Sequence, residues 1–235
     1  MKNYAKTSMR TFGLATLTMT LALLVGCGGP ESDIGKQGDP KPEYAEQVKA
    51  AAASGVMVTC DKTGEVSFLD FHAHPDVSGA VLHVREFPNL RLLNFSSSKL
   101  TDEDLVHLAA AKNVEELGLH GTQVTDEGIQ HLAGMTKLRQ LNLTDTAVTD
   151  VTLEKLKMFG SLVRIDLQNT KVTDEGLKHL ADLKDLVYVQ VSATDVTDDG
   201  VNQLQVALPD AQILNEEIDY SGGTPMMTDA ELPDN

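Results

Sequence analysis

Hydrophobic residues in the centre of the chain follow a spacing that changes within each stretch of 24 residues. Apolar residues first alternate with polar ones, as at Leu93 and Phe95, and then recur at helical spacing, as at Leu105 and Leu108. Alternation predicts a short strand with one buried face, and spacings of three or four predict an amphipathic helix. The pattern starts again at residues 89, 113, 137, 161 and 185. Residues 65–214 therefore predict about six units, each with one strand, one turn and one helix.

The repeated segments share more than their apolar positions. Two of them read KLRQLNLTDTAVTDVTLEKLKMFG and SLVRIDLQNTKVTDEGLKHLADLK, and all five fit the pattern L-x-x-L-x-L-x-x-T-x-V-T-D-x-x-L-x-x-L with small departures. This pattern resembles the leucine-rich repeat family, and within it the exported bacterial lipoproteins whose repeats have a Val-Thr-Asp turn. The resemblance implies an α/β solenoid with a parallel sheet on its concave face and helices on its convex face. Each unit has one apolar wall that only a neighbouring unit can cover, so we expect an obligatory stack.

Two polar columns recur in the turns of these units. The first is a hydroxyl column, Ser98, Thr122, Thr146, Thr170 and Thr194, which we expect to be buried and to satisfy backbone groups where the chain leaves the sheet. The second consists of Thr-Asp pairs at 101/102, 125/126, 149/150, 173/174 and 197/198, which we expect to cap the helices that follow.

The stretch before the regular repeats predicts an N-terminal cap at residues 43–64. EYAEQVKAAAASG indicates a short helix ending near Gly55, and MVTCDKTGEVSF indicates a hairpin in which Gly64 has a positive φ. One period before residue 89 lies a degenerate first repeat, residues 65–88. We expect its Val66, Leu69 and Phe71 to lie in the core.

The strand of this first repeat also carries a motif with possible chemistry. LDFHAHPDVSG, residues 69–79, resembles the Asp-x-His-x-His strand of amidohydrolase-type metalloenzymes. A metal-dependent hydrolase centred on Asp70, His72 and His74 is therefore an alternative hypothesis. However, an eightfold barrel needs about 250 residues, and the next histidine on the same predicted face, His120, lies two rungs away, roughly 10 Å at strand spacing. We therefore expect no metal, no cofactor and no catalytic residue.

The negative net charge of the chain disfavours partners that are themselves strongly negative. It has 19 Lys and Arg against 35 Asp and Glu in 235 residues, a net charge of −16. Such a surface repels phosphate backbones and anionic lipid headgroups, so nucleic acid is not an expected partner.

The N-terminus predicts export and lipid anchoring. Lys2, Lys6 and Arg10 flank an apolar run that ends in Leu-Val-Gly-Cys at Cys27, which resembles the lipobox of bacterial lipoproteins. The resemblance implies a signal peptide at residues 1–26, cleavage before Cys27 and acylation of its thiol. Cleavage leaves 16 basic residues against 35 acidic ones, near −19. Gly28 after the cysteine favours the outer membrane over the inner one, with the protein facing the periplasm or the exterior.

The segments on either side of the repeats are polar. Residues 27–42 are rich in Gly, Pro and charge and predict a flexible tether. Residues 215–235 are acidic and contain Gly and Pro, and they predict a disordered tail. After acylation of Cys27, Cys60 would be the only remaining thiol, so no intramolecular disulfide is expected, and Cys60 is predicted to be a small buried residue.

The expected concave face carries the candidate binding residues. It combines polar side chains with a few aromatic and apolar ones, a mixture that suits a protein or peptide partner. The candidates are Phe68, His72, Leu92, Glu116, His120, Gln140, Arg164, Asp166 and Tyr188. The sequence thus favours a lipid-anchored, non-catalytic scaffold that binds a protein at the cell envelope as a monomer. A purely structural envelope protein without a specific ligand is a further alternative.

Overall fold

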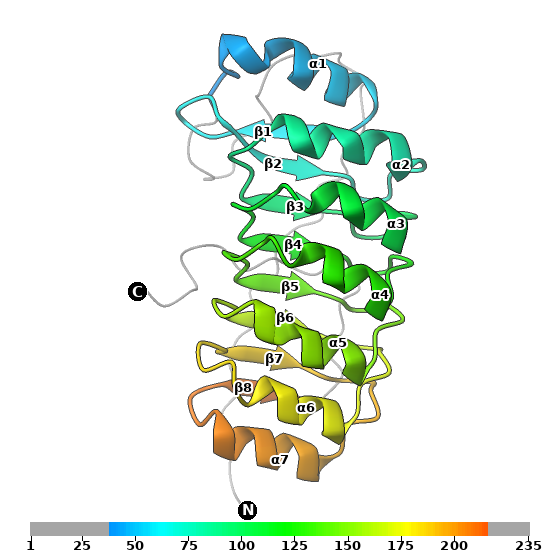
Figure 1. Ribbon diagram of the computed structural model, residues 1–235, viewed down its shortest axis with the longest axis vertical. Coiled ribbons are helices and arrows are strands. Elements are labelled where there is room, and N and C mark those ends of the chain that lie inside the picture. The colour runs from blue at the N-terminus through cyan, green and yellow to red at the C-terminus, as the bar shows by residue number, and fades with distance from the viewer. Residues whose placement is uncertain (1–37, 216–235) are drawn as a thin grey trace, which may run out of the picture.

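The structure is a computed structural model in which residues 38–215 are described. It contains one sheet of eight strands in the order β1-β2-β3-β4-β5-β6-β7-β8, with the helices stacked along one side of the sheet (Figure 1). The strands are β1 Met57–Cys60, β2 Val66–Asp70, β3 Leu92–Asn94, β4 Glu116–Gly118, β5 Gln140–Asn142, β6 Arg164–Asp166, β7 Tyr188–Gln190 and β8 Gln212–Leu214.

The helices are short, and in most repeats the α-helix is followed directly by a 3₁₀ segment. They are α1 Ala45–Ala53, α2 Val77–Ala80, α3 Asp102–Leu105, α4 Asp126–Ile129, α5 Asp150–Lys155, α6 Asp174–Leu180 and α7 Asp198–Ala207. Short 3₁₀ segments are η1 Pro42–Tyr44, η2 Val81–Glu86, η3 Val106–Leu108, η4 Gln130–Leu132 and η5 Leu156–Met158. Among the described residues, none of these helices is long and apolar enough to cross a membrane.

The sheet confirms the period found in the sequence. From β2 to β8 all neighbouring strands are parallel, and each residue pairs with the residue 24 positions further on, as Phe68 does with Leu92 and Leu92 with Glu116. The predicted hairpin is also present, because β1 pairs antiparallel with β2 and Gly64 in its turn has φ 82°. Helix α1 packs against this hairpin at the start of the stack (Figure 1).

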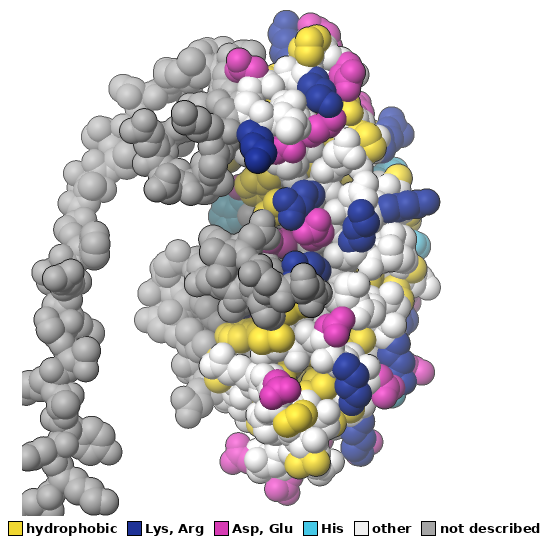
Figure 2. All heavy atoms as spheres, turned by 90° about the vertical axis from the view of Figure 1, so that its left-hand side faces the viewer, with side chains coloured by type: hydrophobic (Ala, Val, Ile, Leu, Met, Phe, Trp, Pro, Cys, Tyr) yellow, Lys and Arg dark blue, Asp and Glu magenta, His cyan; other side chains and the backbone are white. Residues whose placement is uncertain are grey.

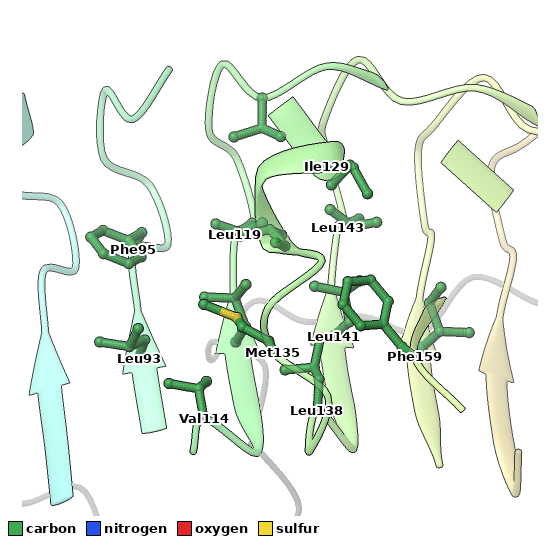
Figure 3. Packing of buried hydrophobic residues seen from close by; sticks show 14 of the residues in the cluster. Leu93, Phe95, Val114, Leu119, Ile129, Met135, Leu138, Leu141, Leu143 and Phe159 are labelled. Carbon is green, nitrogen blue, oxygen red and sulfur yellow. The ribbon is translucent and has the colours of Figure 1, made fainter. Parts of the chain in front are cut away.

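The core lies between the sheet and the helices and repeats from rung to rung. Each strand from β2 to β7 contributes a central buried residue such as Leu93 or Leu141, and residues that follow, such as Phe95 and Leu143, are also buried (Figure 3). Burying one such side chain is worth about 1.5–3 kcal/mol. Val66, Leu69 and Phe71 of the first repeat join this core as predicted, and so does Cys60.

The hydroxyl column bonds to the backbone in four of its five members, of which Thr122, Thr146 and Thr170 are buried and Thr194 is half-buried. Thr122, Thr146, Thr170 and Thr194 each donate from Oγ1 to the backbone carbonyl three residues earlier, at 2.5–2.7 Å. Ser98 is buried as predicted, but the predicted hydrogen bond is wrong, because its Oγ has no hydrogen-bond partner among the described residues. At the equivalent position of the first repeat, His74 Nε2 lies 2.7 Å from the Ser54 carbonyl oxygen.

The Thr-Asp pairs do more than the predicted capping. The threonines cap the helices: Thr125 Oγ1, for example, accepts from the Glu127 backbone N–H at 3.2 Å. The aspartates bond to the next repeat instead. Asp102 accepts from the backbone N–H of Thr125 at 2.8 Å and from its hydroxyl at 2.6 Å. The same bridge recurs at Asp126/Thr149, Asp150/Thr173 and Asp174/Thr197. A ladder of carboxylates thus ties four pairs of rungs together.

Glycine makes room for this carboxylate ladder. A Cβ atom added at Gly176 would lie 2.1 Å from Asp150 Oδ1, and one at Gly128 would lie 2.2 Å from Asp102 Oδ1. At the equivalent position 152 the chain has threonine, whose hydroxyl donates to Asp126 Oδ1 at 2.6 Å. Position 152 therefore adds a hydrogen bond where Gly128, Gly176 and Gly200 have no side chain.

A column of residues with positive φ lies in the turns after β2 to β7. Ala73, Ser97, Asp145, Asn169 and Ala193 all have φ between 52° and 59°. The remaining member of the column, Gly121, has φ 64°. This left-handed conformation costs L-residues roughly 1 kcal/mol relative to glycine, so the turn geometry is held by the surrounding stack.

Candidate functional site

The candidate binding residues lie on the face of the sheet opposite the core. In β3 to β7 the middle residue is buried under the helices, and the residues on either side of it point the other way because side chains alternate along a strand. The strand register places Phe68, Leu92, Glu116, Gln140, Arg164 and Tyr188 in one row, with about 4.8 Å between neighbours. A second row contains Asp70, Asn94, Gly118, Asn142, Asp166 and Gln190.

Arg164 is the centre of the most ordered contacts on this face. Its Nε and Nη2 donate to the two carboxylate oxygens of Asp166 at 2.8 and 3.0 Å. Its guanidinium carbon also lies 4.1 Å from the ring centroid of Tyr188 on the next strand. All three residues are less than a tenth exposed. A two-pronged ion pair and a cation–π contact therefore hold the guanidinium in one orientation.

The second row fixes the turns that leave the sheet. Asp70 Oδ1 accepts from the His72 backbone N–H at 2.9 Å and from Asn94 Nδ2 at 2.9 Å. Asn94 Oδ1 accepts from the Ser96 backbone N–H at 3.1 Å, and Asn142 Oδ1 does the same for Thr144 at 3.0 Å. These side chains act as local acceptors for the turn backbone, so their main contribution is to shape the rim of the face.

The predicted candidates differ in exposure. Glu116 and Gln140 are buried, Phe68 and Leu92 are half-buried, and His72 is exposed in the turn after β2. His120 is half-buried in the turn after β4, where its Nδ1 lies 3.3 Å from Asp145 Oδ2. The structure brings Arg164, Asp166 and Tyr188 into direct contact, and it leaves His72 at the far end of the stack. Sequence reasoning assigned these residues to the strand columns in which they lie, but it did not foresee which members would touch.

The metal alternative finds no support in the geometry at the first repeat. The ring of His74 is engaged with the backbone, since Nε2 lies 2.7 Å from the Ser54 carbonyl and Nδ1 accepts from the Asp76 N–H at 3.3 Å. Asp70 Oδ1 already accepts two hydrogen bonds. Within residues 38–215 no three His, Cys, Asp or Glu side chains are grouped so that they could hold an ion.

Comparison with known proteins agrees with this architecture. A family model described as "Leucine Rich repeat" matches residues 161–181, which include β6, the turn after it and α6. No curated protein matches the sequence significantly.

Solved structures resemble the chain over most of its length. An internalin C2 from Listeria monocytogenes matches with a TM-score of 0.52 and 18% identity, over 78% of this chain and 89% of that chain. The ectodomain of the Arabidopsis receptor kinase HAESA, in complex with an N-terminally extended IDA peptide hormone, matches with a TM-score of 0.49 and 13% identity. That match covers 72% of this chain and 32% of the receptor chain. With its unclosed parallel sheet and convex helices, the chain is a protein of the leucine-rich-repeat fold.

Proposed function

We propose that this chain is an exported, lipid-anchored scaffold that binds a protein partner through its concave face and catalyses no reaction. The observation that carries the proposal is the contact group of Arg164, Asp166 and Tyr188. Arginine and tyrosine are enriched among the residues that contribute most to protein–protein binding.

The geometry of this group suits recognition because it is already ordered. Asp166 accepts two hydrogen bonds from the guanidinium of Arg164, and the ring of Tyr188 on the next strand stacks on that guanidinium. Side chains fixed before binding lose little conformational entropy when a partner arrives. Buried Glu116 and Gln140 continue the same row, so a partner contacting the row would meet charge, amide and aromatic groups at the spacing of the strands.

A scaffold also fits the use that the structure makes of its polar residues. The recurrent aspartates and threonines bond to one another or to backbone groups between repeats. His74 and Asp70, which the hydrolase alternative requires, are engaged in the same kind of local bonding. The side chains that could do chemistry therefore have structural roles.

The anchoring part of the proposal rests on the sequence. Cys27 and residues 1–26 lie outside the described residues, and the lipobox-like Leu-Val-Gly-Cys at residues 24–27 supports acylation. An acyl chain on Cys27 would hold the solenoid at the membrane, with residues 28–42 as a spacer. The cell envelope, with the outer membrane favoured, is the proposed location, and a monomer is the proposed state.

Affinity capture from envelope extract tests the binding proposal. The tagged wild-type chain is expected to retain a specific protein, and the variant Arg164→Glu/Tyr188→Ala is expected to lose it. Arg164→Lys should lose much of the binding as well, because an ammonium cannot reproduce the planar fork of a guanidinium.

A matched charge reversal on the convex side controls for net charge. Lys178→Glu changes the charge by the same amount as Arg164→Glu, on an exposed helix surface. The convex variant should retain the partner. If both variants retain it equally, binding through the concave face is wrong.

A further inference from the structure

A hollow of about 570 Å³ lies along the edge where the strands begin. Its floor is formed by Val163, Leu186 and Val187, and Val187 is 37% exposed although it is apolar. The other lining residues are polar or charged: Glu115, Lys137, Arg139, Ser161, Lys184, Asp185 and Asp210. The hollow spans residues of five successive rungs, a distance of roughly 19 Å at strand spacing. This shape suits an extended stretch of polypeptide lying along the stack.

The upper end of the hollow carries positive charge. Lys137 Nζ donates to Asn113 Oδ1 at 2.8 Å, and the guanidinium of Arg139 makes no hydrogen bond or ion pair within residues 38–215. The one carboxylate there, Glu115, accepts two hydrogen bonds from Arg91 at 2.9 and 3.0 Å. Lys and Arg side chains are spread over this edge of the molecule, which faces the viewer in Figure 2. In a chain with a net charge of −16, this edge presents a guanidinium available for an anionic group.

The last twenty residues of the chain match this surface in charge and polarity. Residues 216–235 contain six acidic residues and no lysine or arginine. Three of the acids, Glu216, Glu217 and Asp219, surround Ile218 close to the start of the segment. An acidic stretch with an interspersed apolar residue complements basic groups beside a floor of valine and leucine.

The segment also starts close enough to reach the hollow. The described chain ends at Asn215, directly after β8, and the Gln212 backbone N–H of β8 donates to the carbonyl of Val187 in the hollow's lining at 2.8 Å. A twenty-residue polypeptide without regular structure would have a root-mean-square span of about 25 Å, comparable to the length of the hollow. Attachment to the same chain gives an effective concentration in the millimolar range, so weak contacts suffice for docking.

We propose that the acidic C-terminal segment, residues 216–235, docks in the strand-start hollow of its own chain with its carboxylates on Lys137 and Arg139. Arg139, Val163 and Val187 directly precede the concave-face residues Gln140, Arg164 and Tyr188. The docked segment therefore lies beside the concave face. The docking does not rest on the proposed function.

Photo-cross-linking in the purified full-length chain, kept in detergent, tests the docking. A photoreactive residue replaces Ser161, which is exposed at the hollow, and in a control chain it replaces Glu154, which is exposed on α5. The expected result is cross-linked peptides from residues 216–235 at position 161 and none at position 154, in a product of monomer mass. Because no partner is present, failure here leaves the proposed binding of a partner untouched.

Charge exchange makes the test specific. Lys137→Glu/Arg139→Glu should lower the cross-linking yield at least about fivefold, and Asp229→Lys/Glu231→Lys/Asp234→Lys in the same chain should restore it, because these acids lie far enough from Asn215 to reach the two basic residues. Circular dichroism confirms that each variant is folded. The proposal is overturned if position 161 captures no part of residues 216–235, or if the double reversal leaves the yield unchanged. A product of dimer mass alone also overturns it, because the segment would then come from a second copy.

Discussion

Replacing Asp126 by alanine removes the best-connected carboxylate of the ladder between repeats. Asp126 accepts four hydrogen bonds from the next repeat, from the backbone N–H and the hydroxyl of both Thr149 and Thr152, at 2.6–3.1 Å. In Asp126→Ala these donors lose their acceptor while they remain partly buried. Water reaches only some of them, so the variant should be less stable than the wild type.

The size of the loss follows from the four bonds. A hydrogen bond to a charged group contributes about 1.5–3 kcal/mol, but bonds to one carboxylate are not additive, and Asp126 is half-buried. We expect a decrease in the free energy of unfolding of about 2–4 kcal/mol. Asp126→Asn keeps one carbonyl oxygen as an acceptor and should lose about half as much.

Urea unfolding followed by circular dichroism measures this difference through linear extrapolation. The matched control is Glu127→Ala, one residue further on, where the side chain is exposed and accepts no hydrogen bond from the next repeat within residues 38–215. The control should change the unfolding free energy by less than about 0.5 kcal/mol. If Asp126→Ala and Glu127→Ala have equal stability, the carboxylate ladder does not stabilise the stack.

The pH dependence gives a second measure of the same carboxylate. Burial alone would raise the pKa of Asp126, but the hydrogen bonds from Thr152 and Thr149 outweigh it and hold the pKa below the ordinary value for aspartate. A carboxyl group whose pKa is lower in the folded state stabilises the fold above its unfolded pKa, about 3.9. This stability is lost as the pH falls through the folded pKa. The difference between wild type and Asp126→Ala should therefore shrink below about pH 4.

Three further outcomes can be checked with similar measurements. Ala193→Gly relieves the positive φ of 54° in the turn after β7 and should raise the unfolding free energy by up to about 1 kcal/mol; a lower value contradicts the strain argument. Gly176→Ala places a Cβ 2.1 Å from Asp150 Oδ1 and should cost about 1–3 kcal/mol, and an unchanged urea midpoint would show that the helix can shift freely. Cys27→Ser should abolish incorporation of labelled fatty acid and move the protein from the detergent-rich to the aqueous phase, and retention of the label would disprove acylation at this residue.

The period of the sequence was sufficient to predict the sheet. Positions 24 residues apart had to stack because each unit has a single apolar wall, and the strands pair with that offset from Phe68 to Gln212. LDFHAHPDVSG lies one period before the regular repeats and keeps their register, so its Leu69 and Phe71 occupy core positions.

The carboxylate ladder could not be read from capping rules. An aspartate after threonine is favourable at a helix start for local reasons alone, so the pattern in one repeat conceals the contact with the next. The sequence did contain a signal for this contact, because a glycine or threonine recurs two residues after the aspartate of successive Thr-Asp pairs, at Gly128, Thr152 and Gly176. Only the structure of the stacked repeats shows that these residues leave space for the carboxylates of Asp102, Asp126 and Asp150.

The candidate site was predictable by column but not by contact. Alternation along each strand assigns Arg164, Asp166 and Tyr188 to the concave face. Whether the guanidinium turns to Asp166 on its own strand, to Tyr188 on the next or toward solvent depends on rotamers that the spacing does not determine. The ion pair and the ring contact therefore emerge only from the structure.

Photo-cross-linking in intact cells tests the central claim, binding of a protein by the concave face, most directly. A photoreactive residue replaces His120, in the turn that borders this face, and in a control chain it replaces His131 on the convex 3₁₀ segment η4. The two positions are matched because both histidines are half-buried. The proposal predicts a discrete cross-linked protein from position 120 and none from position 131. Capture from position 131 alone, equal capture from both, or capture from neither would contradict it.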